Sequence, residues 1–420
     1  DWLYKIKELT VETVMNYIIE SDWIQTDENV QELSAFLLQV INNDSTYHSY
    51  ISDLLIQLND KANESNSLNI LIPFIVQKLM SSFGDSLLNC SFIYNLFKRG
   101  IISKETLKTK FIKFFDNDDE KLNKKANRFG YDINDYRIDK NRKSSNLISW
   151  FYPEIIEIEE IKDKINFFEQ NSNHAFIQRY FPNNVQEYYK MRDSGEPDDE
   201  LTRALRYDDV DTLQSLLIKK SFLVESNKNN SSNNKESRLS KELLKVVVPF
   251  NLFEDFVPNG LTNYINYACA YGSLKCFKYL LLNHERVDQI SFDLAVFGGN
   301  IEIIKIVSQN IKDDANSKKK FASFFNESKK EKFPAIIKHR NDIFDWIFQE
   351  KYKGKIVDDD LMYELLISTA KNGNAHALIE IIDEGINCIN SSHEIINSCA
   401  RNGFYLFTKL FINIFKTKKN

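Results

Sequence analysis

Three groups of side chains have the types and spacing that could support chemistry, and two of these could bind metal. The acidic run at 116–120, DNDDE, is similar to the start of a calcium-binding loop, but the central glycine and the distal glutamate are missing. We therefore interpret it as solvated surface. The histidines lie far apart in the chain, so a zinc cluster would need long-range coincidence. They are His48, His174, His284, His339, His376 and His393.

The third group is the cysteines. Cys269 and Cys276 could approach each other on facing helices, but two small buried apolar side chains are the simpler interpretation. The chain has five cysteines, an odd number, and no CxxC pair. A disulfide framework is therefore not expected, and reduced thiols of a cytoplasmic protein are predicted.

Two lysine clusters, at 318–320 and 329–332, lie on either side of Phe321, Phe324 and Phe325. Basic residues interleaved with aromatic residues can bind nucleic acid. Here Phe321, Phe324 and Phe325 follow helical spacing, so we expect the rings to face a core and the lysines to face water. The sequence contains no GxGxxG, GxxxxGK[ST], GxSxG or HExxH motif. We expect no enzyme, no cofactor, no metal and no small-molecule substrate.

The composition indicates a helical protein. Glycine occurs 12 times in 420 residues, where average usage of ~7% would give about 29, and proline occurs seven times. The net charge of −6 gives no general attraction to nucleic acid or anionic membranes. The apolar run at 70–76, ILIPFIV, is far shorter than the ~20 residues of a membrane span, and the opening DWLYKIKELT has no signal-peptide core.

The N-terminal part has the apolar periodicity of half-buried helices. Residues 1–115 are predicted to be a helical region, with helices from about Ile70 to Phe83 and from about Ser86 to Lys98, the latter ending at Gly100. A polar connector is predicted at 116–146 and a further helical segment at 147–197. Repeats are predicted over 198–420, with a disordered insert at 227–238. The apolar stripes are Val11, Val14, Met15, Ile18 and Ile19; Val30, Leu33, Leu37, Val40 and Ile41; and Tyr47, Tyr50, Ile51, Leu54, Leu55 and Leu58.

Five segments of the C-terminal half align with one another. They are YACAYGSLKCFKYLL (267–281), LAVFGGNIEIIKIV (294–307), PAIIKHRNDIFDWIF (334–348), STAKNGNAHALIEII (368–382) and SCARNGFYLFTKLFI (398–412). LTRALRYDDVDTLQSLL (201–217) is a weaker copy. The aligned anchors are Gly272, Gly299, His339, Gly373 and Gly403, and the mean spacing of these five is about 33 residues. In the weaker copy, Asp208 stands at the anchor position.

Each segment is predicted to be two helices joined at its anchor. Glycine allows the chain to leave the first helix in a left-handed conformation. Small residues allow neighbouring first helices to pack closely, and the aligned positions hold Ala268, Ala295, Ala335, Ala370 and Ala400. A single pair cannot bury its apolar face alone, so the pairs must stack.

The period and phrases such as FGGNIEIIKI and KHRNDIFDWIF resemble the degenerate ankyrin-like family that is greatly expanded in trichomonad and related protists. The ankyrin TPLH tetrapeptide is absent, and NYIN stands in its place at 263–266. The resemblance is most specific over 200–412. It implies an all-α fold in which an ankyrin-like solenoid follows a helical N-terminal region. It also implies that the solenoid binds proteins and has no catalytic residues.

The expected function is therefore a protein–protein interaction scaffold or adaptor that uses the concave face of the solenoid. The alternative is a structural component of a cytoskeletal assembly, associated with microtubules or filaments; the identity of the protein partner is left open. Tyr and Arg dominate many interfaces. The candidate partner-binding residues close the first helices or lie on the loop at 284–286: Tyr271, Phe297, Lys338, Lys371, Asn372, Arg401, Asn402, His284, Glu285 and Arg286.

Overall fold

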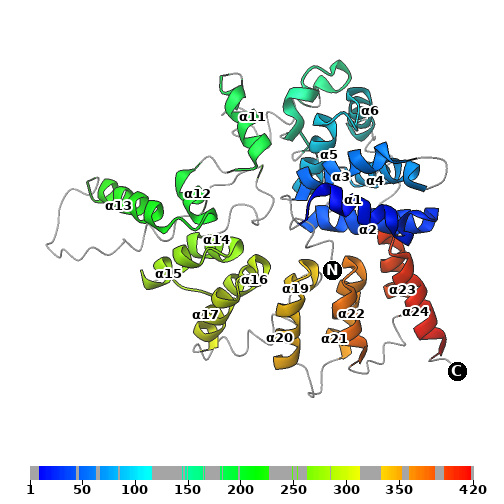
Figure 1. The fold of residues 1–420 in the computed structure, drawn as a ribbon. Helices are drawn as coiled ribbons and strands as arrows, with labels where there is room; N and C mark the ends of the chain where they lie inside the picture. The colour runs from blue at the N-terminus through cyan, green and yellow to red at the C-terminus, as the bar shows by residue number, and fades with distance from the viewer. Residues whose placement is uncertain are drawn as a thin grey trace. The chain divides into compact units, whose positions relative to one another are not determined.

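The computed structural model is helical throughout the part of the chain that it describes, and no strand occurs there (Figure 1). The described residues are 9–43, 47–62, 67–83, 86–115, 144, 147–148, 150–163, 165, 180–181, 183–196, 199–226, 248, 253, 263–283, 285–312, 333–351, 359–383 and 392–417. The predicted all-α class is confirmed for these residues. None of the helices in these ranges combines the length and apolar character that a membrane crossing requires.

The chain forms two compact units. One, the N-terminal unit, comprises residues 2–196 and the short segment 252–255; the other, the C-terminal unit, comprises 197–251 and 256–420. Two predicted segments lie outside the described residues: the connector at 116–146, except for Ser144, and the insert at 227–238.

The helices of the N-terminal unit follow the predicted apolar stripes. Ile18, Leu37 and Leu54, one from each stripe, are completely buried. Helix α5 ends at Lys98, and Gly100 follows with a φ of +76°, so the predicted stop is confirmed. The elements are α1 (Val11–Glu20), η2 (Asp22–Ile24), α2 (Asp27–Asn43), α3 (His48–Asp60), η4 (Ser67–Ile70), α4 (Leu71–Ser81), α5 (Leu87–Lys98), α6 (Lys104–Phe115), η5 (Glu159–Ile161) and α11 (Val185–Ser194).

Aromatic ring contacts join helices α5 and α6 to the residues after 147. The Phe151 ring lies 5.5 Å from that of Phe111 and 6.4 Å from that of Tyr94. Residues 147–196 therefore belong to the same compact unit as the helices before 115. Interlocking rings on both sides of the connector explain this arrangement, because each ring is covered by the other segment.

Phe253 completes this core from far along the chain. Its side chain is 1% exposed, and its ring meets those of Trp150 at 4.9 Å and Tyr188 at 5.2 Å, both edge to face. Its carbonyl oxygen would lie 3.6 Å from a Cβ placed on Gly195, the left-handed residue that ends α11. The N-terminal unit therefore includes a short segment, 252–255, that is flanked on both sides in the chain by residues of the C-terminal unit.

The C-terminal unit is a row of helix pairs, and we refer to the first and second helix of each pair. The first helices contact one another in chain order, from α12 to α14, α16, α19, α21 and α23. Second helices also meet, as α13 with α15, α15 with α17 and α20 with α22. The pairs are α12 (Glu200–Arg206) with α13 (Val210–Ser226), α14 (Tyr264–Tyr271) with α15 (Leu274–Leu282), α16 (Gln289–Gly298) with α17 (Ile301–Lys312), α19 (Pro334–Ile337) with α20 (Asn341–Lys351), α21 (Asp359–Asn372) with α22 (Ala375–Asp383), and α23 (Ser392–Asn402) with α24 (Tyr405–Thr417) (Figure 1).

Every pair turns on a residue in the left-handed region, at the anchor that the sequence predicted. Four anchors are Gly272, Gly299, Gly373 and Gly403, and the other two are Asp208 at φ +55° and His339 at φ +50°. Each of the last two gains a hydrogen bond that offsets the left-handed strain. The Asp208 carboxylate accepts the backbone N–H of Cys276 at 2.9 Å, and the His339 ring bonds to the carbonyl of Asn372 at 2.9 Å.

Small residues lie between neighbouring first helices as predicted. Ala268, Ala295 and Ala370 are completely buried and Ala335 is nearly so, but Ala400, in the last pair of the row, is exposed. The first helices α14 and α16 also approach each other closely at Gly298, where a Cβ atom would lie 2.3 Å from the carbonyl oxygen of Cys269. The alignment did not identify this position, since it was centred on Gly299.

Replacing Ala295 by leucine is expected to destabilise the C-terminal unit by about 1–3 kcal/mol, because the added carbons have no space between α14 and α16. Ala400→Leu is the matched control, since it occupies the same register position on an exposed surface. Its effect should stay within about 0.5 kcal/mol. Thermal unfolding of both variants measures the difference, and equal effects would contradict the packing of the aligned alanines.

Candidate functional site: the turn edge

The turns of the helix pairs lie side by side, and we define the turn edge as the two residues before and the one after each left-handed residue. Cation–aromatic contacts connect successive turns. The guanidinium of Arg206 lies 5.4 Å from the centre of the Tyr271 ring, and the Lys338 ammonium lies 4.0 Å from that of Phe297. Such pairs contribute about 0.5–1 kcal/mol at exposed sites and hold both side chains in place.

Hydrogen bonds also cross from turn to turn. The Asn300 side-chain amide donates to the carbonyl of Gly272 at 3.0 Å, and the Asn374 amide donates to that of Ile336 at 3.1 Å. Burial lowers the pKa of His339 to about 4, although its bond to Asn372 opposes this shift, so the ring is neutral and Nε2–H donates to that carbonyl. These bonds pre-form the turn edge, and a ligand would not have to order it.

The structure brings together seven of the ten predicted partner-binding residues along this edge. Five of them are half-buried: Tyr271, Phe297, Lys338, Lys371 and Asn372. Two are exposed: Arg401 and Asn402. By contrast, residues 264–270 of α14 and 365–370 of α21 are buried, so these two first helices are accessible mainly at their ends.

The other three predicted residues lie on the loop at 284–286 and behave differently. Arg286 is exposed, and His284 lies outside the described residues. Glu285 is only 7% exposed, which corrects the expectation that it faces a partner. Its Oε2 accepts the backbone N–H of Ile265 at 2.9 Å, and Oε1 has no hydrogen-bond partner. Glu285 therefore satisfies a backbone donor in the first turn of α14.

Because burial raises the pKa of Glu285 from 4.5 to about 7, partly offset by the bond from Ile265, the folded protein binds this proton more tightly than the unfolded chain does. The resulting stabilisation is complete below about pH 4.5 and is lost as the pH rises through about 7. Glu285→Gln should therefore match the wild type at pH 4 and exceed its free energy of unfolding at pH 8, by about 1–3 kcal/mol.

Thermal unfolding across pH 4–8 measures this difference between Glu285→Gln and the wild type. Glu364→Gln, on the exposed surface of α21, is the control for replacing a carboxylate by an amide at an exposed position. A Glu285→Gln variant that loses stability at pH 8 would contradict this assignment.

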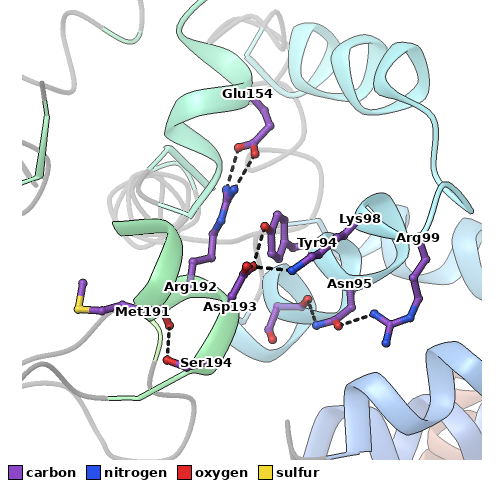
Figure 2. Close-up of polar contacts among 10 residues, drawn as sticks. Tyr94, Asn95, Lys98, Arg99, Glu154, Met191, Arg192, Asp193 and Ser194 are labelled. Carbon is purple, nitrogen blue, oxygen red and sulfur yellow. Dashed lines mark hydrogen bonds and ion pairs between the residues drawn. The ribbon is translucent and has the colours of Figure 1, made fainter. Parts of the chain in front are cut away.

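The N-terminal unit holds a cluster of charged groups that sequence reasoning missed (Figure 2). Arg192 of α11 forms two hydrogen bonds with the Glu154 carboxylate, at 2.8 and 2.9 Å, and a third with the carbonyl of Trp150 at 3.1 Å. Its guanidinium lies 3.9 Å from the centre of the Tyr94 ring. The side chains of Arg192 and Glu154 are 2% and 15% exposed. This pair fixes the segment around 150–155 to α11.

The chemistry available to this cluster is limited. Burial raises the pKa of the Tyr94 hydroxyl to about 12, and that hydroxyl donates to Asp193, which also binds Lys98 at 2.9 Å. Burial disfavours the charged form of Arg192, but the hydrogen bonds that it donates to Glu154 favour that form together with the nearby negative charge, and the pKa of Arg192 lies above the ordinary value. Tyr94 and Arg192 therefore keep their protons near neutral pH, and neither is prepared for general acid–base catalysis. We assign the cluster a structural role.

The described cysteines are buried thiols. Cys90, Cys269, Cys276 and Cys399 form no disulfide, and burial raises the pKa of both Cys276 and Cys399 to about 12. Thiols in this state are poor nucleophiles. Within the described ranges, no group of three or more His, Cys, Asp or Glu side chains could hold a metal ion. The acidic run at 116–120, the lysine-rich stretch at 318–332 and Cys388 lie outside those ranges.

The turn edge is thus the one predicted site whose members the structure places together among the described residues. Comparison with models of protein families, with curated proteins and with solved structures finds no match to this chain.

Proposed function

We propose that the C-terminal unit is a degenerate ankyrin-like solenoid and that the chain is a non-enzymatic adaptor that binds a partner protein along its turn edge. The observation that carries this proposal is the series of left-handed turns from Gly272 to Gly403, at a mean spacing of about 33 residues, with His339 in place of one glycine. Asp208 forms a further left-handed turn before this series. Stacked helix pairs of this period build extended surfaces that are used for binding.

The composition of the edge supports binding. Tyr271 and Phe297 present aromatic area, and Arg206 and Lys338 lie against their rings. Tyrosine, tryptophan and arginine side chains are enriched among the residues that contribute most to binding, near the centres of protein interfaces. The contacts from turn to turn reduce the entropy that would be lost on binding.

The test is a comparison of proteins captured from extract of the cells that express the chain. The edge variant is Tyr271→Ala with Phe297→Ala, and the matched control is Leu282→Ala with Ile301→Ala, two exposed apolar residues on second helices. We expect specific partners to be retained by the wild type and the control and lost from the edge variant. Partners that are retained by the edge variant, or lost equally from both variants, would contradict the proposal.

A further inference from the structure

The turn edge is basic although the whole chain is acidic. The chain carries a net charge of −6, whereas the single acidic residue at the turn-edge positions is Asp209. Asp208, the left-handed residue of the same turn, is held by the N–H of Cys276. The cationic residues at these positions come from four turns: Arg206, Lys338, Arg340, Lys371 and Arg401.

Two of these cations are exposed and carry charges that no described carboxylate neutralises. Arg340 and Arg401 are both exposed, and neither forms an ion pair with any residue that the structure describes. Elsewhere in the same unit, an ion pair joins two successive second helices, Lys278 of α15 with Glu302 of α17 at 2.5 Å. The positive charges of Arg340 and Arg401 are therefore available to a ligand.

Helix capping does not account for this charge. Cations are favourable at the C-terminal end of a helix, where the helix dipole is negative, and this explains part of the preference for Lys371 and Arg401. Arg340, however, directly precedes α20, and at this N-terminal end the dipole disfavours a cation. Its guanidinium lies across the neighbouring turn, because a Cβ atom on Gly299 would come within 2.7 Å of Arg340 Cζ. The Arg340 side chain thus carries positive charge from its own turn to the preceding turn at Gly299.

The spacing of the turns suits an extended chain. Packed helices lie about 8–10 Å apart, and a peptide in the extended polyproline II conformation advances about 3.1 Å per residue with three residues per turn, so side chains three residues apart share one face. Acidic side chains three residues apart would therefore meet successive turns. Carboxylates match the guanidinium groups of Arg340 and Arg401, which can bind both oxygens of a carboxylate.

We propose that the turn edge binds an extended acidic segment of a partner protein, with carboxylates about three residues apart, lying along the row of helix pairs. This inference rests on the proposed function, because it specifies the chemistry of the partner at the same surface. Charge complementarity selects the acidic segment, and a basic segment would be repelled.

Fluorescence anisotropy with labelled model peptides tests the inference on the full chain. The probe is a peptide of about 15 residues with glutamate at every third position between Ser and Gly, and a lysine peptide of the same pattern and an oligothymidylate serve as comparisons. The edge variant is Lys371→Gln with Arg401→Gln. The matched control is Lys275→Gln with Lys305→Gln, two exposed lysines on second helices.

We expect saturable binding of the glutamate peptide that weakens as salt is added, since salt screens exposed charges. The edge variant should bind about tenfold more weakly, and the control should stay within about twofold of the wild type. Thermal unfolding shows whether both variants fold as the wild type does. If the edge variant fails to fold, Arg340→Gln, paired with Lys305→Gln as its control, replaces it.

Three results would overturn the inference: no saturable binding of the glutamate peptide, equal loss in edge and control variants, or binding of the lysine peptide as tight as that of the glutamate peptide. Equally tight, edge-dependent binding of oligothymidylate would overturn it too and would assign the edge to nucleic acid. If the capture experiment finds edge-dependent partners while the peptides fail to bind, the adaptor function stands and only the acidic specificity falls.

Discussion

Replacing Gly298 by alanine is expected to destabilise the C-terminal unit by about 3 kcal/mol or more. The new Cβ atom would lie 2.3 Å from the carbonyl oxygen of Cys269 and 2.8 Å from that of Ala270. Both atoms belong to the backbone of α14, so relief requires α14 and α16 to move apart along a contact that buries Ala268 and Ala295. The midpoint of thermal unfolding of this unit should fall by about 10 °C.

Gly100→Ala is the control for this substitution. Gly100 also has a positive φ, but a Cβ atom there meets nothing within 4 Å. Its replacement should introduce only left-handed backbone strain, at about 1–2 kcal/mol. Scanning calorimetry separates the two effects, and similar losses for Gly298→Ala and Gly100→Ala would mean that the close approach of α14 and α16 is not tight.

Replacing Glu154 by alanine is expected to destabilise the N-terminal unit by about 3–5 kcal/mol, because it leaves the Arg192 guanidinium buried without its counter-charge. Arg192 would keep its bond to the Trp150 carbonyl and its contact with the Tyr94 ring. Neither supplies a negative charge. Denaturant unfolding measures the loss.

A double variant and an exposed pair complete this experiment. Arg192→Met with Glu154→Leu removes both charges, so it should be more stable than the Glu154→Ala variant. Lys98→Ala breaks the neighbouring pair with Asp193, whose side chains are 53% and 42% exposed, and should cost less than about 1 kcal/mol. A double variant as unstable as Glu154→Ala would show that packing, and not the lost counter-charge, causes the effect.

The repeat alignment predicted more of the fold than the letters of any one segment could. Asp208 and His339 are unusual in the left-handed region, yet the register placed a turn at both, and both turns are found there. Register carries this information because each pair must present the same faces to its neighbours. The same reasoning located the buried alanines between first helices. The ankyrin type and the adaptor function stay predictions.

Contacts between residues far apart in the chain could not be predicted from the sequence. Arg192 and Glu154 are separated by 38 positions and belong to no periodic pattern, so nothing in either segment indicates that they pair. The position of Glu285 on the loop at 284–286 predicts an exposed side chain, since loops usually lie at the surface. Its carboxylate instead reaches back 20 positions to Ile265. Such contacts depend on how elements pack in three dimensions.

The position of Phe253 has a consequence for how this chain matures during translation. The ribosome delivers residues in order, and N-terminal regions ordinarily begin to fold first. Here the ring that meets Trp150 and Tyr188 is not synthesised until the first helix pair of the following unit, α12 and α13, has already been synthesised. The earlier unit therefore reaches its final packing only after synthesis of the later one has begun.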